Sequence, residues 1–584
     1  MRLAHFTWVS ALLMGVVMPL SATEIEWPVY GGDNLHQRHS KLTQINKSNV
    51  SSLIEAWEFD TGINDTFQAT PVVLNGVMYV SLPFNDVVAL DAATGKQLWR
   101  YEHVLDENYP ICCGPANRGV AVANGMVFTG TIDARLIALD ARTGQKRWDR
   151  RVIGEDRGIQ EDVSKLTDSE LGSVSGTSGA GINMAPMIYQ DTVIIGITGV
   201  GYGLHLEDAM DADSALGTVV GIAGKYGRRG FMAGYDINTG EQKWQFDTIK
   251  SEGWEGNFVT ETADGVKLPR DISQEKAALA EHADAWRYGG ASAWSTPVID
   301  PYTGILHFGT GNPSPQMEGS SRPGDNLYSS SLLALDANSG DYRWHYQQVP
   351  HDSWGYDVAS PPVLFDISIR GEPIPAIGQA GKTGWFYVHD RRNGKFLYKS
   401  EAFVPQQNMF SLPSAEGTII YPGVMGGVNW SPVSVDTRRR LVFIPGIHWP
   451  VEYKLHQQAA AEGQEAVRYS SMSPLNTVEK YGLLTAIDLD SGKIVWQVKT
   501  ENPLIGGVLS TASGLVFVGE GKGELMAFDA DSGEKRWSGA TEAGVNAPPI
   551  SYSINGKQHI AVAVGGNRLF GFKTGQKIKV WRLP

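Results

Sequence analysis

The two cysteines of the chain, Cys112 and Cys113, are adjacent, and Arg118 follows them at short range. Neighbouring Cα atoms lie about 3.8 Å apart, whereas disulfides prefer Cα separations of about 4.4–6.8 Å. A bridge between these cysteines would therefore be a strained ring with a flat, apolar outer surface, and such strain occurs mostly at functional sites. The alternative is a chance pair of free thiols. An oxidising compartment favours the disulfide.

The N-terminus predicts export into such a compartment. Arg2 and His5 precede an apolar run from Phe6 to Leu20, which ends in the small residues Ser21-Ala22-Thr23. This order is typical of a cleaved secretory signal, and the run is too short for a comfortable membrane span. We expect residues 1–22 to be a signal peptide, residues 23–584 to form a single domain without a membrane span, and the protein to be periplasmic.

Composition limits the partners. The 584 residues carry a net charge of −14, which argues against nucleic acid and favours a basic partner such as a small cytochrome c. Two cysteines leave no Cys-x-x-Cys-His motif, so no covalently attached haem is expected in the chain itself. Structural zinc on three or four cysteines is excluded for the same reason.

A repeated phrase indicates the architecture that must position any site. An apolar strand ends in Asp, a polar turn with Gly follows, and a second strand delivers Trp, as in Asp91…Gly95…Trp99. The turn residues suit a tight hairpin. Further copies begin at Asp140, Asp236, Asp336, Asp488 and Asp529, and a weaker copy at Asp390 has Tyr398 in place of Trp. Four strands per unit with Trp at a fixed offset predict an all-β propeller whose Trp residues pack between blades.

The spacing of the copies predicts about eight blades, because each long gap has room for two. A degenerate blade is expected around Ser431 to Ile444. We expect the ring to close by pairing residues 569–572 and 580–581 with Trp27-Pro-Val-Tyr30. Polar inserts at 150–180, 201–230 and 455–475 are interpreted as long loops, which serve either as lids or as surface decoration.

These features resemble the periplasmic quinoprotein alcohol dehydrogenases, which carry pyrroloquinoline quinone (PQQ) at the centre of an eight-bladed propeller. The resemblance covers essentially the whole mature chain. It rests on the Trp repeat, on Cys112-Cys113 with Asn117-Arg118-Gly119, and on three further motifs: Gly309-Thr-Gly-Asn312-Pro, His351-Asp352-Ser-Trp354 and Gln379-Ala-Gly-Lys382-Thr-Gly384.

The resemblance implies a PQQ site. Cys112 and Cys113, as a disulfide, would cover one face of PQQ, and Trp294 would stack on the other; the alternative for Trp294 is packing between blades. Arg118 and Lys382 would bind oxygens of PQQ, and Lys382 would stabilise negative charge on the reduced ring. Further cofactor contacts are implied for Gln68, Thr198 and Asn429, with Asn183 as a looser match.

The resemblance also implies a calcium or lanthanide ion on Asn312, although Asn312-Pro313 is equally a turn signal. Relatives place a catalytic Asp directly after the Trp of the His-Asp-x-Trp motif, where this chain has Gly355. Asp357 or Asp352 would have to replace that base, and Asp357 is favoured. It matches an extra metal-binding Asp of lanthanide-using relatives, so it is a metal ligand, a displaced base, or a plain strand residue.

The chain also differs from the family pattern at a second expected metal ligand. Alcohol enzymes of the family supply a Glu where this chain has Thr198-Gly-Val-Gly201 or, with a later gap, Lys225. Glu207 or Asp208 is the candidate replacement.

The resemblance therefore predicts a PQQ-dependent dehydrogenase with catalytic residues Asp357 and Lys382. It would oxidise an alcohol, polyol or sugar-like substrate and reduce an external acceptor, either a cytochrome c or a quinone-linked one. The alternative is a PQQ-binding propeller with weak or no activity, acting as a sensor or scaffold.

Overall fold

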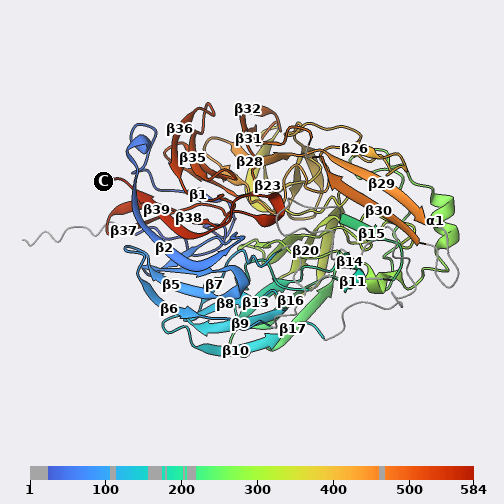
Figure 1. Cartoon of the computed structure of the whole chain (residues 1–584), viewed down its shortest axis with the longest axis horizontal. Coiled ribbons are helices and arrows are strands. Elements are labelled where there is room, and N and C mark those ends of the chain that lie inside the picture. The colour runs from blue at the N-terminus through green and yellow to red at the C-terminus, as the bar shows by residue number, and fades with distance from the viewer. Residues whose placement is uncertain are drawn as a thin grey trace, which may run out of the picture.

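A computed structural model describes residues 24–105, 114–154, 174–177, 180–201, 204–206, 219–225, 227–458, 467–475 and 477–584. Eight antiparallel sheets follow one another along this described part (Figure 1). In each, the first strand pairs with the second, the second with the third and the third with the fourth. The prediction of an all-β, eight-bladed propeller is confirmed.

The first four blades contain the following strands, each named from its first to its fourth strand. They are β3 (Val72–Leu74), β4 (Val77–Ser81), β5 (Val87–Asp91) and β6 (Gln97–Tyr101); β7 (Ala121–Ala123), β8 (Met126–Gly130), β9 (Arg135–Asp140) and β10 (Lys146–Arg151); β12 (Met187–Tyr189), β13 (Thr192–Gly196), β16 (Phe231–Asp236) and β17 (Gln242–Asp247); β18 (Val298–Ile299), β19 (Ile305–Gly309), β20 (Ser331–Asp336) and β21 (Tyr342–Gln347).

The last four blades complete the ring, and the sixth is the degenerate blade predicted near Ser431. Their strands are β22 (Val363–Ile369), β23 (Glu372–Ala380), β24 (Phe386–Asp390) and β25 (Phe396–Lys399); β27 (Ser434–Asp436), β28 (Leu441–His448), β31 (Tyr481–Asp488) and β32 (Ile494–Thr500); β33 (Val508–Thr511), β34 (Leu515–Glu520), β35 (Glu524–Asp529) and β36 (Lys535–Ala540); β37 (Ile550–Ile554), β38 (Lys557–Val564), β39 (Gly575–Arg582) and β2 (Ile54–Asp65).

The repeated Trp packs between blades as predicted. Trp99 lies on the turn of the next blade, where its indole Nε1 donates a hydrogen bond to the carbonyl of Ala141 at 2.9 Å. Gly144 leaves room for the indole, because a Cβ on it would lie 2.6 Å from Trp99 Cε3. Trp57, Trp148 and Trp496 donate in the same way to the following blades. Tyr398 takes this role in the weaker copy and donates to the carbonyl of Leu489.

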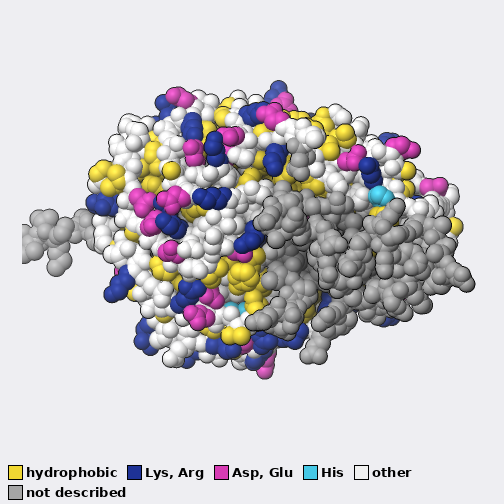
Figure 2. Space-filling model, in the orientation of Figure 1, with side chains coloured by type: hydrophobic (Ala, Val, Ile, Leu, Met, Phe, Trp, Pro, Cys, Tyr) yellow, Lys and Arg dark blue, Asp and Glu magenta, His cyan; other side chains and the backbone are white. Residues whose placement is uncertain are grey.

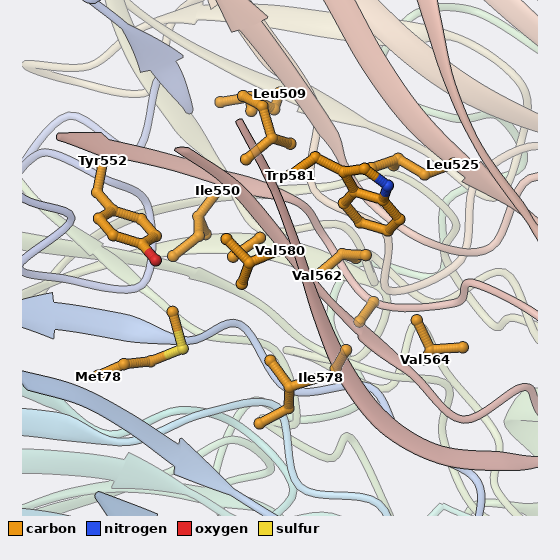
Figure 3. Packing of buried hydrophobic residues seen from close by; sticks show 14 of the residues in the cluster. Met78, Leu509, Leu525, Ile550, Tyr552, Val562, Val564, Ile578, Val580 and Trp581 are labelled. Carbon is orange, nitrogen blue, oxygen red and sulfur yellow. The ribbon is translucent and has the colours of Figure 1, made fainter. Parts of the chain in front are cut away.

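The ring is closed by the strand at 54–65, so the expected partner of the C-terminal strand was wrong. Strand β39 pairs antiparallel with β2, the two lying side by side in Figure 1, whereas Trp27 bridges to Val73 of the first blade. Residues 568–570 form a 3-10 turn rather than a strand. Exposed and buried residues alternate along β2, which fits a strand at the edge of the last sheet. Figure 3 shows buried side chains of the other strands of this sheet, β37 to β39, packing with Leu509 and Met78 of the adjacent blades.

Two of the inserts join in one additional sheet instead of remaining loops. Strand β15 (Val219–Ile222) pairs with β30 (Val467–Pro474), which pairs with β29 (Val451–Gln458) and through it with β26 (Thr418–Ile420). Buried Tyr453 and Met472 show why this polar segment forms strands: one face is covered. Smaller elements are β1 (His39–Ser40) on β33, the pair β11 (Val174–Thr177) and β14 (Leu204–Leu206), and helix α1 (Ile272–Ala278).

The other helical segments within the described ranges are short 3-10 turns, namely Val50–Ser52, Pro83–Asn85, Ala285–Tyr288 and Arg568–Phe570. None of the helices in the described ranges has the length and apolar character needed to cross a lipid bilayer.

Candidate active site

The topology of a blade brings two kinds of loop to the same end of the ring. In an antiparallel pair, the beginning of the first strand lies beside the end of the second. Arg118, Trp294 and Asp357 precede first strands, whereas Asn312 and Lys382 follow second strands. Side chains from several blades therefore converge at one end of the central axis, although they lie far apart in sequence.

They converge on a cavity of about 870 Å³, part of which is open to solvent. Its wall contains each described residue that the sequence predicted for the cofactor and the metal: Gln68, Arg118, Asn183, Thr198, Trp294, Asn312, Asp357, Lys382 and Asn429. Trp294 lies in a loop at this wall rather than on an outer strand, so packing between blades is not its location.

A buried ion pair forms the polar centre of the wall. Lys382 Nζ lies 3.1 Å from Asp357 Oδ2 and donates a second hydrogen bond to the carbonyl of Gly355 at 3.0 Å. The other carboxylate oxygen, Asp357 Oδ1, accepts from the backbone N–H of Asn312 at 2.6 Å. Both charged side chains are at most one-tenth exposed. The carboxylate is thus held in one orientation beside a fixed ammonium group.

The side-chain amide nitrogen of Asn312 donates hydrogen bonds to two backbone carbonyls of the protein. Asn312 Nδ2 donates to the carbonyls of Gly201 at 2.9 Å and Pro313 at 2.8 Å. Gly201 permits this approach, because a Cβ there would lie 3.2 Å from that nitrogen. The side-chain oxygen of Asn312 is then the group left to face a cation, and hard cations prefer such oxygen ligands.

Arg118 lies between two indole rings. Its guanidinium carbon is 5.0 Å from the ring centres of both Trp294 and Trp430, and its Nη1 donates to the carbonyl of Trp294 at 3.2 Å. Stacking of this kind holds a cation in place through the negative face of the aromatic ring. Arg118 and Lys382 therefore supply positive charge to the cavity from two different blades.

Several neutral amides complete the wall. Gln68 Oε1, Gln316 Oε1 and Asn567 Oδ1 are buried without a hydrogen-bond partner among the described residues. Buried polar atoms are normally satisfied, so these acceptors point to a ligand. Asn429 is instead engaged locally, with Nδ2 donating to Met425 and Oδ1 accepting from Trp430 N.

The absence of a side chain at Gly355 leaves no empty space, because side chains from other segments fill it. Its φ is +77°, and a Cβ built on it would lie 2.7 Å from both Gln316 Nε2 and Val424 Cγ2. Asp352 does not reach the cavity. Its oxygens accept from Trp354 N, Gly355 N and Ser330 Oγ, and burial raises the pKa of this carboxyl. Of the two proposed replacements for the base, Asp357 alone lines the cavity.

Four of the predicted site residues, Cys112, Cys113, Glu207 and Asp208, lie outside the described residues. Lys225 is described, and it pairs with Asp284 at 3.1 Å rather than lining the cavity. Within the described ranges, no three His, Cys, Asp or Glu side chains gather closely enough to hold a metal ion.

Other wall residues were missed by the sequence analysis. Trp430 carried a weak signal, since it directly follows Asn429. Gln316, Met472 and Asn567 carried none, because they come from irregular loops and from the additional sheet.

Cations, a buried carboxylate and two indoles around a cavity at one end of an eight-bladed propeller suit an anionic, planar small molecule. Comparison with known proteins identifies the family. The description "PQQ: Glucose/ethanol/alcohol dehydrogenase, beta-propeller domain" matches residues 27–410 and 404–560. The chain belongs to this family of PQQ-dependent dehydrogenases, which are oxidoreductases acting on CH–OH groups.

Two sequence relatives are similar over most of their length. The quinohemoprotein alcohol dehydrogenase of Comamonas testosteroni is 33% identical over 94% of this chain and 73% of its own. The quinoprotein alcohol dehydrogenase PedH of Pseudomonas putida is 33% identical over 93% of this chain and 87% of its own.

Two solved structures of similar proteins share the overall fold of this chain. The Comamonas enzyme superposes with a TM-score of 0.76 at 30% identity, covering 96% of this chain and 80% of that one. A structure described as a europium-containing methanol dehydrogenase gives 0.75 at 26% identity, covering 96% and 98%.

Proposed function

We propose that this protein is a PQQ-dependent dehydrogenase that oxidises an alcohol, polyol or sugar-like substrate and passes the electrons to an external acceptor. The observation that carries the proposal is the buried Asp357–Lys382 pair on the wall of a cavity that also contains Arg118 and Trp294. Family membership supports the same reaction class.

The residues present fit the cofactor. PQQ is planar and bears carboxylates and quinone oxygens, which match the two cations and the indole of Trp294. Cys112 and Cys113 remain proposed as the wall opposite Trp294. When bound, PQQ would supply the acceptor for the substrate's hydride, which carries both electrons of the oxidation.

The protein's own contribution is positioning and proton handling. Asp357 is the one carboxylate among the described residues that line the cavity, and its Oδ2 lies beside a cation, so Asp357 accepts the hydroxyl proton of the substrate. Lys382 Nζ holds that oxygen in place and supplies positive charge for the oxygens of the cofactor. The backbone N–H of Asn312 fixes the other oxygen and so sets the direction of proton transfer.

A calcium or lanthanide ion is proposed on Asn312 Oδ1 and Asp357. These are oxygen donors, as such ions require, but two side chains leave most of the coordination to the cofactor and water. Bound there, the ion would supply Lewis-acid chemistry.

Cofactor binding without turnover is the second candidate, and Gly355 favours it. Among the described cavity residues Asp357 is the single carboxylate, and it is already engaged by Lys382 and Asn312. Such a protein would act as a sensor or scaffold.

One experiment separates the two candidates. The purified protein is loaded with PQQ and either calcium or a lanthanide, and an alcohol panel is assayed with an artificial electron acceptor. Turnover supports the dehydrogenase. Tight PQQ binding with no turnover under any metal would establish the second candidate instead.

Export and the natural acceptor are proposed on sequence grounds. The apolar run from Phe6 to Leu20 supports a cleaved signal and a periplasmic location, and the net charge of −14 supports a basic cytochrome c as acceptor. On the face shown in Figure 2, basic and acidic side chains are interspersed. Cell fractionation and sequencing of the mature N-terminus test the location, and salt-dependent reduction of a basic cytochrome tests the acceptor.

A further inference from the structure

Gln316 is a buried polar residue of the cavity that the proton-transfer scheme does not use. Its side chain lines the cavity, yet the residue is 2% exposed, and Oε1 has no hydrogen-bond partner among the described residues. Leaving such an acceptor unpaired is destabilising, because it loses its hydrogen bonds to water and gains none in the fold. Oε1 is therefore an acceptor that none of the described residues satisfies, and a bound ligand could pair with it.

The amide lies next to the ion pair that handles the reacting hydroxyl. Gln316 Nε2 packs over Gly355, where a Cβ would come within 2.7 Å of it, and the carbonyl of the same Gly355 accepts from Lys382 Nζ at 3.0 Å. Gln316 and Asp357 thus line the same cavity, with Gly355 and Lys382 as neighbours of the first and the second.

Part of the cavity wall that contains Gln316 is apolar. Val424, Met425, Met472 and Phe570 line the cavity and belong to one buried hydrophobic cluster with Met317. A carbon chain fits this wall, and Gln316 is a hydrogen-bonding group set within it. A hydroxyl can donate a hydrogen bond to Gln316 Oε1, whereas the carboxylate and quinone oxygens of the cofactor can only accept.

We propose that Gln316 binds a second hydroxyl of the substrate, on the carbon adjacent to the one oxidised. The enzyme then prefers vicinal diols and polyols to simple alcohols of the same carbon skeleton. This inference rests on the proposed dehydrogenase function and narrows its substrate class. It makes Gln316 a specificity-determining residue, with Asp357 still the proton acceptor.

Turnover gives the first test. In the PQQ-loaded protein, we expect kcat/KM for propane-1,2-diol to exceed that for propan-1-ol about tenfold, the effect of one hydrogen bond. Gln316→Met keeps the length of the side chain, and should lower the value for the diol about tenfold more than it lowers the value for propan-1-ol. Met472→Leu, an apolar change on the same wall, should affect both substrates alike.

Binding gives a second test that needs no turnover. Tertiary alcohols have no hydrogen on the carbinol carbon and cannot be oxidised. Dissociation constants of the PQQ-loaded protein for pinacol and for 2,3-dimethylbutan-2-ol are measured from tryptophan fluorescence, since Trp294 and Trp430 line the cavity. We expect wild type to prefer pinacol several-fold, and Gln316→Met to lose that preference.

The outcomes are distinct. Equal treatment of diol and monoalcohol by wild type, or an unchanged preference in Gln316→Met, overturns the role of Gln316 even if turnover is high. Absence of turnover with every alcohol, together with a pinacol preference that Gln316→Met removes, overturns the dehydrogenase proposal and leaves the diol-binding role of Gln316 standing.

Discussion

At the scale of single residues, the chemistry depends on two neighbouring positions, Gly355 and Asp357. Glycine at 355 leaves room for the Gln316 amide, and its carbonyl helps to hold Lys382. Asp357 then presents a carboxylate to the cavity from two residues further along. Neighbouring side chains occupy the space that a side chain at position 355 would need. The site therefore differs from the family pattern by more than the loss of one carboxylate.

Restoring a carboxylate at 355 should therefore harm the protein. In Gly355→Asp, the new Cβ lies 2.7 Å from Gln316 Nε2 and Val424 Cγ2 at a φ of +77°. We expect a loss of about 1–3 kcal/mol in unfolding free energy and lower turnover. Urea denaturation and kcat/KM measure the two effects.

Gly371→Asp is the matched control, because Gly371 has a φ of +84° and a Cβ added to it would meet no atom within 4 Å. The loss of unfolding free energy in Gly371→Asp therefore measures the cost of placing an aspartate at positive φ without a steric clash. A gain of turnover in Gly355→Asp would show that the missing carboxylate is a simple deficit.

Much of this residue-scale picture was predictable from motifs. Asn312 and Lys382 stand in short glycine-rich phrases, and the structure places both on the cavity wall. Gln316 was not predictable, because its role depends on the close contact of its amide with Gly355, which stands in a different segment of the chain. Spacing within one segment carries no information about a contact between two segments.

At the scale of elements, the Trp–Gly contact between blades is the repeated unit of stability. Trp99 packs on the turn of the next blade at Gly144, whose φ is +73°. The sequence predicted that the Trp packs between blades, because it recurs at a fixed offset within each copy, but it did not predict Gly144 as its partner. It did not predict the sheet of β15, β30, β29 and β26, whose strands come from separate inserts without a repeat.

Gly144→Ala should be much more destabilising than a glycine change elsewhere. Its Cβ would lie 2.6 Å from Trp99, so overpacking of about 1–3 kcal/mol adds to a backbone cost of about 1–2 kcal/mol. Gly125→Ala is the control, with a φ of +71° and open space around the Cβ. Equal midpoints of thermal unfolding for the two variants would argue against the docking contact as a source of stability.

At the scale of the whole molecule, closure joins the two ends of the chain, since β2 is the outer strand of the blade built by β37 to β39. The predicted partner, residues 27–30, was wrong because an aromatic-rich segment resembles a strand. The alternation of exposed and buried residues in β2 is a stronger signal of a strand in this sheet. Trp57 of β2 also contacts the next blade in the way that the repeated Trp residues do.

Buried histidines make the fold sensitive to acid. Burial lowers the pKa of His36, His307 and His351 to about 3, against 6.5 in the unfolded chain. Between these values the unfolded state binds more protons, so stability is full above about pH 6.5 and is lost as the pH falls toward 3. Each histidine contributes a slope of about 1.4 kcal/mol per pH unit.

Unfolding free energy measured at about pH 7.5 and about pH 5.5 checks this expectation, and the lower pH should give the smaller value. His307→Gln should reduce the pH dependence by about one proton. A free energy that is constant between these two pH values would contradict the burial of neutral histidines.

The most direct test of the central claim compares two aspartates five residues apart. Asp357→Asn and Asp352→Asn each remove one carboxylate without removing bulk, but Asp357 alone lines the cavity. In protein loaded with PQQ and its metal, we predict that Asp357→Asn lowers kcat/KM at least about a hundredfold while PQQ still binds. Asp352→Asn should keep most of the turnover. Wild-type turnover in Asp357→Asn, or its loss in Asp352→Asn alone, would contradict the assignment of Asp357 as the proton acceptor.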